Sequence, residues 1–174
     1  MPYFTSDEDY WIDSADFVFY SGHGNINGWQ CVEREWFDKT QTSVLYGERN
    51  LKWITLNSCD VLKDKSFTKN DQDDVFAWAK IFGGLHMLLG YGTPVDSRTD
   101  VGRKFVELMD VRNPIIYSWF KTAKITQNND QTIACVLYSY NDTIDPYNEC
   151  IPGRGTVTAS IQSPKKFKFA YSPC

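Results

Sequence analysis

Asp16-Phe17-Val18-Phe19-Tyr20 runs directly into Ser21-Gly22-His23-Gly24. The first five residues form a short apolar and aromatic run, which is typical of a buried strand, and the next four are typical of a tight turn. A second strand is expected over residues 51–56, and it stops at Asn57-Ser58-Cys59-Asp60. A histidine and a cysteine therefore each follow a predicted strand.

The rest of the chain continues the alternation of strands and helices. Apolar spacing predicts helices over residues 73–82, 99–109 and 114–124 and strands over residues 85–90 and 132–138. Short strands over residues 156–161 and 166–171 are also expected. This order predicts an α/β fold with a mainly parallel sheet flanked by helices on both faces. We expect one domain over residues 1–174, with a core over about 16–140 and an irregular or β-hairpin C-terminal tail over 141–174.

Composition excludes several classes of function. The 174 residues carry a formal net charge of −4, so no basic surface to bind nucleic acid is expected. No apolar run approaches the ~20 residues that span a bilayer. Aromatic residues make up 16% of the chain, which favours a Trp- and Tyr-rich core over a stacking surface for sugars. The acidic N-terminus has no basic segment before an apolar one, so no signal peptide is predicted, and the compartment stays open, with extracellular secretion one alternative.

Five cysteines and two histidines limit the metal and disulfide chemistry. No Cys-x-x-Cys pair is present, which argues against a structural zinc site. Four cysteines can pair in three ways, and a disulfide between Cys150 and Cys174 is the pairing most expected in an irregular C-terminal tail. Extracellular disulfides and reduced thiols both remain open at this point.

The two strand ends carry the candidate chemistry. Ligands of an open parallel sheet bind at the carboxyl ends of its strands, where His23 and Cys59 are both expected. A nearby imidazole accepts the proton of a thiol and so activates it as a nucleophile. The backbone N–H groups of Gly24 and Cys59 are candidate donors to an oxyanion.

These motifs resemble the caspase-like clan of cysteine peptidases, which includes metacaspases, legumains, gingipains and clostripain. The resemblance covers about residues 16–90: His23 matches the dyad histidine, Gly24 the glycine after it, Ser58 the small residue and Cys59 the nucleophile. It implies a three-layer α/β/α fold, with an N-terminal part that is short for the clan. It also implies an endopeptidase that hydrolyses a peptide or protein substrate through an acyl-enzyme, with no cofactor.

Other residues have two interpretations each. Asn57 and Asp60 flank Cys59 and are candidates for the substrate pocket, where Asp60 would bind a basic P1 side chain. Asp71, Asp73 and Asp74 fit a calcium site, as some clan members have, but a solvated helix N-terminus is favoured. His86 lies in an apolar run and is interpreted as a core histidine. The alternative to a peptidase is a catalytically inactive caspase-like binding or scaffold domain.

Overall fold

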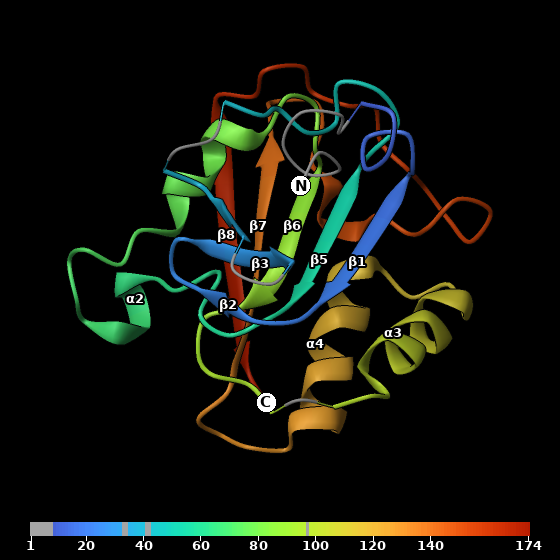
Figure 1. Cartoon of the computed structure of the whole chain (residues 1–174). Helices are drawn as coiled ribbons and strands as arrows, with labels where there is room; N and C mark the ends of the chain where they lie inside the picture. Colours follow the sequence, from blue (N-terminus) through green and yellow to red (C-terminus); the bar gives the residue numbers. More distant parts are fainter. Residues whose placement is uncertain (1–8, 33–34, 41–42, 97) are drawn as a thin grey trace.

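The computed structural model describes residues 9–32, 35–40, 43–96 and 98–174. Its main element is a five-stranded sheet in the order β1-β5-β6-β7-β8 (Figure 1). The strands span Phe17–Ser21 (β1), Trp53–Asn57 (β5), Met87–Tyr91 (β6), Ile133–Tyr140 (β7) and Lys166–Pro173 (β8). All four strongly apolar runs of the sequence are therefore strands of this sheet, as predicted.

Three strands of the sheet are parallel and two are not. β1 pairs with β5 in parallel, with Phe17 opposite Trp53 and Ser21 opposite Asn57, and β5 pairs in parallel with β6. β7 is antiparallel to β6, and β8 is antiparallel to β7. The carboxyl ends of β1, β5 and β6 consequently share one edge of the sheet.

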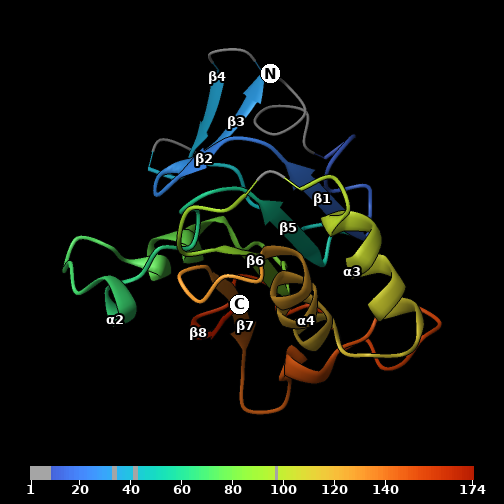
Figure 2. The same cartoon turned by 90° about the horizontal axis from the view of Figure 1, so that it is seen from below.

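The predicted fold class is wrong in two respects. The sheet is mixed rather than mainly parallel, and α-helices cover one face rather than both (Figure 2). The three-layer α/β/α arrangement of the caspase-like clan is therefore not the fold of this chain. The strand directions have a simple cause: β6 is followed by two helices, α3 (Val101–Asp110) and α4 (Ile115–Gln127), before β7. A single helix would return the chain to the edge of the sheet where β6 begins, and the next strand could then run parallel to β6. Two helices return it to the edge where β6 ends, so that β7 runs antiparallel to β6.

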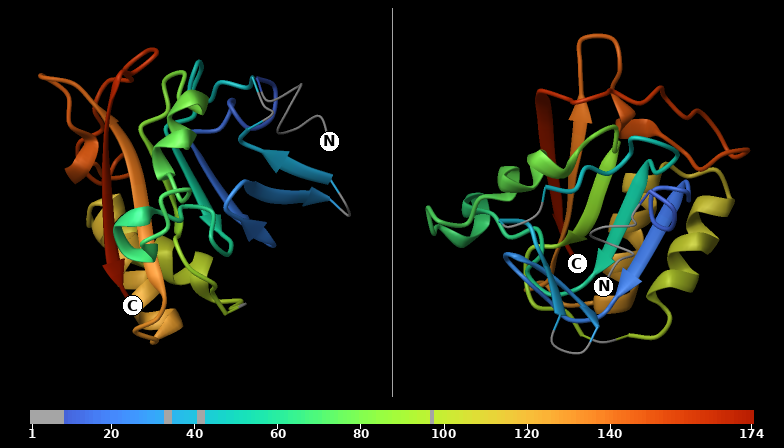
Figure 3. Two further views of the ribbon diagram at one scale, coloured as in Figure 1. Left: turned by 90° about the vertical axis from the view of Figure 1, so that its left-hand side faces the viewer. Right: turned by 45° about the horizontal axis from the view of Figure 1, so that its top comes forward.

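The second face is covered by a small antiparallel sheet in the order β2-β3-β4, which the sequence analysis did not predict. These strands span Gly24–Asn25, Gly28–Val32 and Glu35–Asp38, and Figure 3 shows them projecting from the main sheet. The Asn25 side chain accepts hydrogen bonds from the Asn27 and Gly28 N–H groups and so fixes the turn between β2 and β3. A β-carbon on Gly28 would lie 1.6 Å from the Phe37 carbonyl oxygen, so this position requires glycine. The loop between the two strands is Ile26-Asn27, and Gly28 already belongs to β3, opposite Asn25.

Each face of the main sheet has its own apolar core. On one face, Trp53, Met87 and Leu89 pack against Phe105 of α3 and Trp119 of α4. On the other face, residues of β5 to β7 pack against the small sheet and against the 3₁₀-helix η1 (Val75–Ile81). The buried members from the covering elements include Trp29, Phe37, Trp78 and Ile81. Four of the six tryptophans are buried in these cores, which favours the core interpretation of the aromatic residues over a sugar-binding surface.

The remaining short helices and the C-terminal segment differ in part from the predictions. The helix expected over residues 73–82 is the 3₁₀-helix η1, whose first turn is capped by Asp74, and residues 156–161 form no strand. The C-terminal tail contains the 3₁₀-helix η2 (Pro146–Asn148) and also β8, which is an integral strand of the main sheet. A short helix, α2 (Lys65–Thr68), lies in the loop after β5. No helix among the described residues has both the length and the apolar character needed to cross a bilayer.

The expected disulfide between Cys150 and Cys174 does not form, because both are free thiols. Cys150 is buried, and its Sγ lies 3.7 Å from the Arg112 carbonyl oxygen. Cys174 is buried in the helix-covered core. Cys59 and Cys135 are free thiols as well.

Candidate active site

The ends of β1 and β5 are tied together by three hydrogen bonds. The Asn57 side-chain amide donates to the Ser21 hydroxyl over 2.9 Å, and the Ser58 hydroxyl donates to the Gly22 carbonyl oxygen over 2.9 Å. The Gly22 N–H donates to the Asn57 carbonyl oxygen over 3.3 Å. The parallel pairing of the two strands is thus extended into the two turns that carry His23 and Cys59.

Gly24 lets these turns approach each other closely. A β-carbon at this position would lie 2.6 Å from Ser58 Cβ, 2.7 Å from Val61 Cγ1 and 2.9 Å from the Cys59 carbonyl oxygen. A larger residue would push the segment after His23 away from the turn that holds Cys59. The close packing of the two turns therefore explains why residue 24 is glycine, whether or not the site is catalytic.

His23 and Cys59 line the same cavity, which has a volume of about 320 Å³. The cavity lies at the carboxyl ends of the parallel strands, and its full lining is Ser21, Gly22, His23, Asn57, Cys59, Val95 and Asp96. Ser21, Gly22 and His23 end or follow β1, and Asn57 and Cys59 end or follow β5. Val95 and Asp96 belong to the loop after β6. His23 and Cys59, both among the described residues, therefore lie at the same sheet edge, but no hydrogen bond joins the imidazole to the thiol.

The environments of the two side chains differ. His23 is exposed, and its ring has no hydrogen bond or ion pair with any residue that the structure describes. Cys59 is half-buried, and the Val95 N–H donates to its Sγ over 3.4 Å. A backbone N–H that points at sulfur stabilises negative charge on it. The Cys59 thiol can also donate to the Val95 carbonyl oxygen, which lies 3.8 Å from Sγ. In the core, burial raises the pKa of Cys135 well above its usual value and that of Cys174 to about 11.

The turn after Cys59 is rigid. Asp60 has a positive φ of 57°, a conformation that Asp adopts more readily than most residues. Its N–H donates to the Thr93 carbonyl oxygen, and the Leu62 N–H donates to that of Tyr91. The Cys59 N–H has no acceptor among the described residues, which leaves it available for an oxyanion.

The two predicted pocket residues are placed differently. Asn57 lines the cavity, is 95% buried, and its Oδ1 has no hydrogen-bond partner in the described part of the chain. Asp60 is not among the lining residues; its carboxylate lies 3.5 Å from Lys63 Nζ. The acidic residue that does line the cavity is Asp96, whose side chain is 69% exposed and whose Oδ2 lies 4.0 Å from Arg98 Nη2. The sequence analysis missed Val95 and Asp96, although they follow the third parallel strand and so obey the same strand-end rule as His23 and Cys59.

The acidic residues considered for calcium have local structural contacts. The Asp74 carboxylate accepts a hydrogen bond from the Phe76 N–H at the start of η1, and Asp73 accepts one from the Asn70 side chain. Asp71 lies in the exposed loop before them. The described residues include no group of three or more His, Cys, Asp or Glu side chains that could hold a metal ion.

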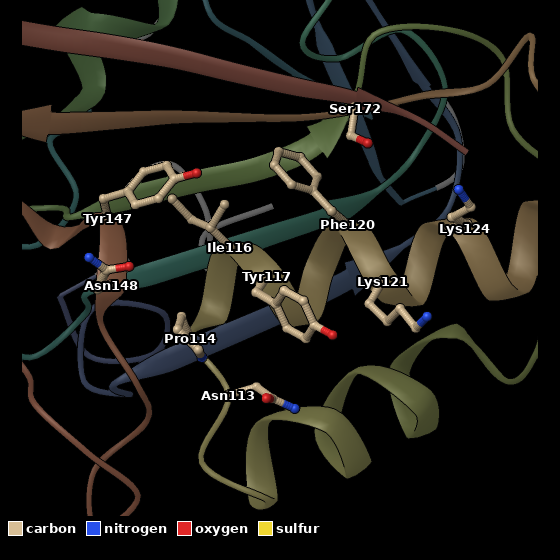
Figure 4. A pocket seen from close by; sticks show the side chains of 10 residues that line it. All are labelled: Asn113, Pro114, Ile116, Tyr117, Phe120, Lys121, Lys124, Tyr147, Asn148 and Ser172. Atoms are coloured by element: carbon tan, nitrogen blue, oxygen red, sulfur yellow. The ribbon is translucent and has the colours of Figure 1, made fainter.

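A second cavity, of about 450 Å³, lies on the helix-covered side between α4, η2 and the end of β8 (Figure 4). Ile116 and Phe120 of α4 supply apolar walls, with Lys121 and Lys124 toward one end and Tyr147 toward the other. It is larger than the cavity at the strand ends, but neither a thiol nor an imidazole lines it. The candidate nucleophile and base belong to the smaller cavity.

The chain was compared with known protein families, curated proteins and solved structures. The model of the family described as "Domain of unknown function (DUF6345)" matches residues 2–172. The chain belongs to this family. No curated protein and no solved structure matched the chain. The cavity of this DUF6345 member must therefore be interpreted from its own residues.

Proposed function

We propose that this protein is a cysteine peptidase in which Cys59 is the nucleophile and His23 is the catalytic base. The observation that carries the proposal is that both residues line one cavity at the ends of two neighbouring parallel strands. Hydrogen bonds from Asn57 and Ser58 hold those strand ends together. The two proposed reacting groups therefore follow strand ends that are hydrogen-bonded to each other.

The proposed reaction follows from these positions. Cys59 Sγ attacks the carbonyl carbon of the scissile peptide bond, and His23 accepts the thiol proton. The N–H groups of Gly24 and Cys59 stabilise the oxyanion, after which the C–N bond breaks and His23 donates the proton to the leaving amine. Water activated by His23 then hydrolyses the acyl-enzyme. No metal or organic cofactor takes part in this scheme.

Two features of the cavity support a peptide as the substrate. The Asn57 Oδ1 is a buried acceptor without a partner among the described residues, and a substrate N–H would satisfy it. The Asp96 carboxylate would favour a basic side chain in the same cavity. The strand-end motifs resemble those of the caspase-like clan, which agrees with peptide hydrolysis, although the fold differs as described above.

A binding domain without turnover is the second candidate, and one observation favours it. In a catalytic triad a third group orients the imidazole, whereas the His23 ring has no such partner among the described residues. The same cavity would then bind a peptide segment without cleaving it. The two candidates differ in what they predict for the Cys59 thiol.

Alkylation and hydrolysis test the proposal together. Iodoacetamide at neutral pH should modify Cys59 faster than any other cysteine of the folded protein, and His23→Ala should slow that modification. A fluorogenic peptide panel with basic, acidic and Asn P1 residues should be hydrolysed by the wild type, best with a basic P1, and not by Cys59→Ala. Cys31→Ser is the matched control, because Cys31 is also half-buried but lines no part of the cavity, and it should keep full activity.

Two results would count against a peptidase. Hydrolysis that survives in Cys59→Ala would exclude Cys59 as the nucleophile. Alkylation of Cys59 no faster than that of Cys31, together with no hydrolysis across the panel, would favour the binding domain.

A further inference from the structure

A second histidine centre lies at the opposite edge of the main sheet. His86 immediately precedes β6, and its N–H donates to the carbonyl oxygen of Lys52, the residue before β5. The His86 Nδ1 lies 2.9 Å from Glu149 Oε1, and its Nε2 lies 2.9 Å from Ser160 Oγ. Glu149 follows η2, and Ser160 belongs to the irregular segment before β8. Three residues that are far apart in the sequence thus form a continuous Ser-His-Glu hydrogen-bond chain.

The partners of Glu149 fix the direction of these hydrogen bonds. The indole N–H of Trp53 donates to Oε2 over 2.9 Å, and the backbone N–H of Thr158 donates to Oε1 over 2.7 Å. The Thr158 hydroxyl also bonds to Oε1. Because indole and amide N–H groups can only donate, the carboxylate is the acceptor, and His86 Nδ1 carries the hydrogen that faces it. In the neutral ring the lone pair of Nε2 then points to the Ser160 hydroxyl.

Burial separates the three members into a shielded pair and an accessible hydroxyl. His86 is 2% exposed and Glu149 is 1% exposed, whereas Ser160 is partly exposed. The base and the group that orients it are therefore protected from water, and Ser160 is the one member of the three that is partly accessible. The backbone N–H groups of Ser160 and Ile161 have no acceptor within the described residues, so donors for an oxyanion are adjacent to the hydroxyl.

We propose that Ser160, His86 and Glu149 form a second catalytic site that hydrolyses small acyl esters. A serine hydroxyl becomes nucleophilic when a base lies within hydrogen-bond distance and a third group orients that base, whatever the order of the three in the sequence. Ser160 is the only one of the three residues that is partly exposed, which favours a small acyl group over an extended polypeptide. This proposal uses no residue of the Cys59 cavity and stands or falls separately from the peptidase proposal.

The proposed reaction has two steps, acylation of Ser160 and hydrolysis of the acyl-serine. Ser160 Oγ attacks the ester carbonyl carbon while its proton moves to His86 Nε2, and Glu149 stabilises the resulting imidazolium. The bond between the acyl carbon and the alkoxy oxygen breaks, and the alcohol leaves with the proton from Nε2. Water then attacks the acyl-serine, gives a proton to Nε2 and releases the carboxylic acid, and that proton returns to Ser160 Oγ.

A fluorophosphonate probe tests this site, with the modified residue identified by mass spectrometry. The folded wild type should be labelled at Ser160, and Ser160→Ala should lose that label. Glu149→Gln keeps the shape of the side chain but replaces the carboxylate, and it should slow labelling by about 100-fold, within the usual contribution of a general base. Ser172→Ala is the matched control, since Ser172 is also partly exposed but donates only to the carbonyl oxygen of Pro173.

The outcomes separate catalysis from a structural role. Circular dichroism and thermal unfolding establish that each variant is folded before labelling is compared. If Glu149→Gln does not fold, the comparison of Ser160 with Ser172 in the wild type is sufficient on its own. Labelling of Ser160 no faster than that of Ser172 in the folded wild type would overturn the proposal and leave the chain of hydrogen bonds as a structural tie.

Discussion

The two histidines of this protein lie at opposite edges of the main sheet, His23 after β1 and His86 before β6, and in opposite environments. His23 is exposed, stands next to a cavity, and has no hydrogen-bond partner for its ring among the described residues. His86 is buried, and both of its ring nitrogens are hydrogen-bonded. The comparison teaches that a ring held by partners is oriented before any ligand arrives, whereas a ring without partners is oriented only by its own segment and by what binds.

The largest expected effect comes from removing the carboxylate that orients His86. Glu149→Ala would leave the N–H groups of Trp53, Thr158 and His86 buried without an acceptor, and we expect it to lower the free energy of unfolding by about 3–5 kcal/mol. His23→Ala removes no hydrogen bond to a described residue and should change it by no more than about 0.5 kcal/mol. Urea denaturation followed by tryptophan fluorescence measures both. Equal effects of the two substitutions would abolish the contrast between the two ends of the sheet.

An intermediate effect is expected from Gly24→Ala at the Cys59 end. The added methyl group would lie 2.6 Å from Ser58 Cβ, which is too close without a shift of the backbone. We expect a loss of about 1–3 kcal/mol in the free energy of unfolding and a slower alkylation of Cys59. Gly102→Ala in α3 is the control, because its β-carbon would meet atoms of Phe19 at 3.3 Å or more and alanine is the better helix former. Gly24→Ala protein with unchanged stability and alkylation would show that the close approach of the two turns is unimportant.

The smallest expected effect is a loss of stability at alkaline pH. It limits the pH range in which substitutions at the His23 and His86 edges of the sheet can be compared. Burial raises the pKa of Cys174 from 9.0 to about 11 and raises the pKa of Cys135 as well. Because folding favours the neutral thiols, their contribution to stability is complete below pH 9 and is lost as the pH rises through about 11. The urea midpoint of the wild type should fall over this interval, and that of Cys174→Ser should fall less. A midpoint that stays constant from pH 8 to pH 11 would contradict the raised pKa values.

The positions of the strands and helices were predictable because their patterns are local. The runs at β1, β5, β6 and β7 are mainly apolar, and α3 and α4 show apolar residues at helical spacing. The direction of β7 was not predictable from its own sequence, because a strand buried on both faces looks the same in either direction. It depends on the pair of helices that precedes it. The small sheet was missed because its strands are short and partly polar, and its first turn, Ile26-Asn27, is not a standard hairpin dipeptide.

The candidate site was predicted to the extent that it follows strand ends. His23, Cys59 and Asn57 line one cavity because they end or follow two adjacent parallel strands. Asp60 was a reasonable candidate by its position next to Cys59, but the turn directs its carboxylate to Lys63. Asp96 enters the cavity from the loop after β6, and nothing in its local sequence marks it as different from other exposed aspartates.

The sequence by itself determined the strands β1, β5, β6 and β7 and the helices α3 and α4, and it placed an imidazole and a thiol directly after β1 and β5. It did so because hydrophobic periodicity and glycine-flanked turns act over a few residues. Only the tertiary structure decided the mixed direction of the sheet, the covering of one face by a small antiparallel sheet, and the meeting of His86 with Glu149 and Ser160. Those features depend on contacts between residues that are far apart in the sequence, which no local pattern encodes. His86, for example, lies 63 positions from Glu149 and 74 from Ser160.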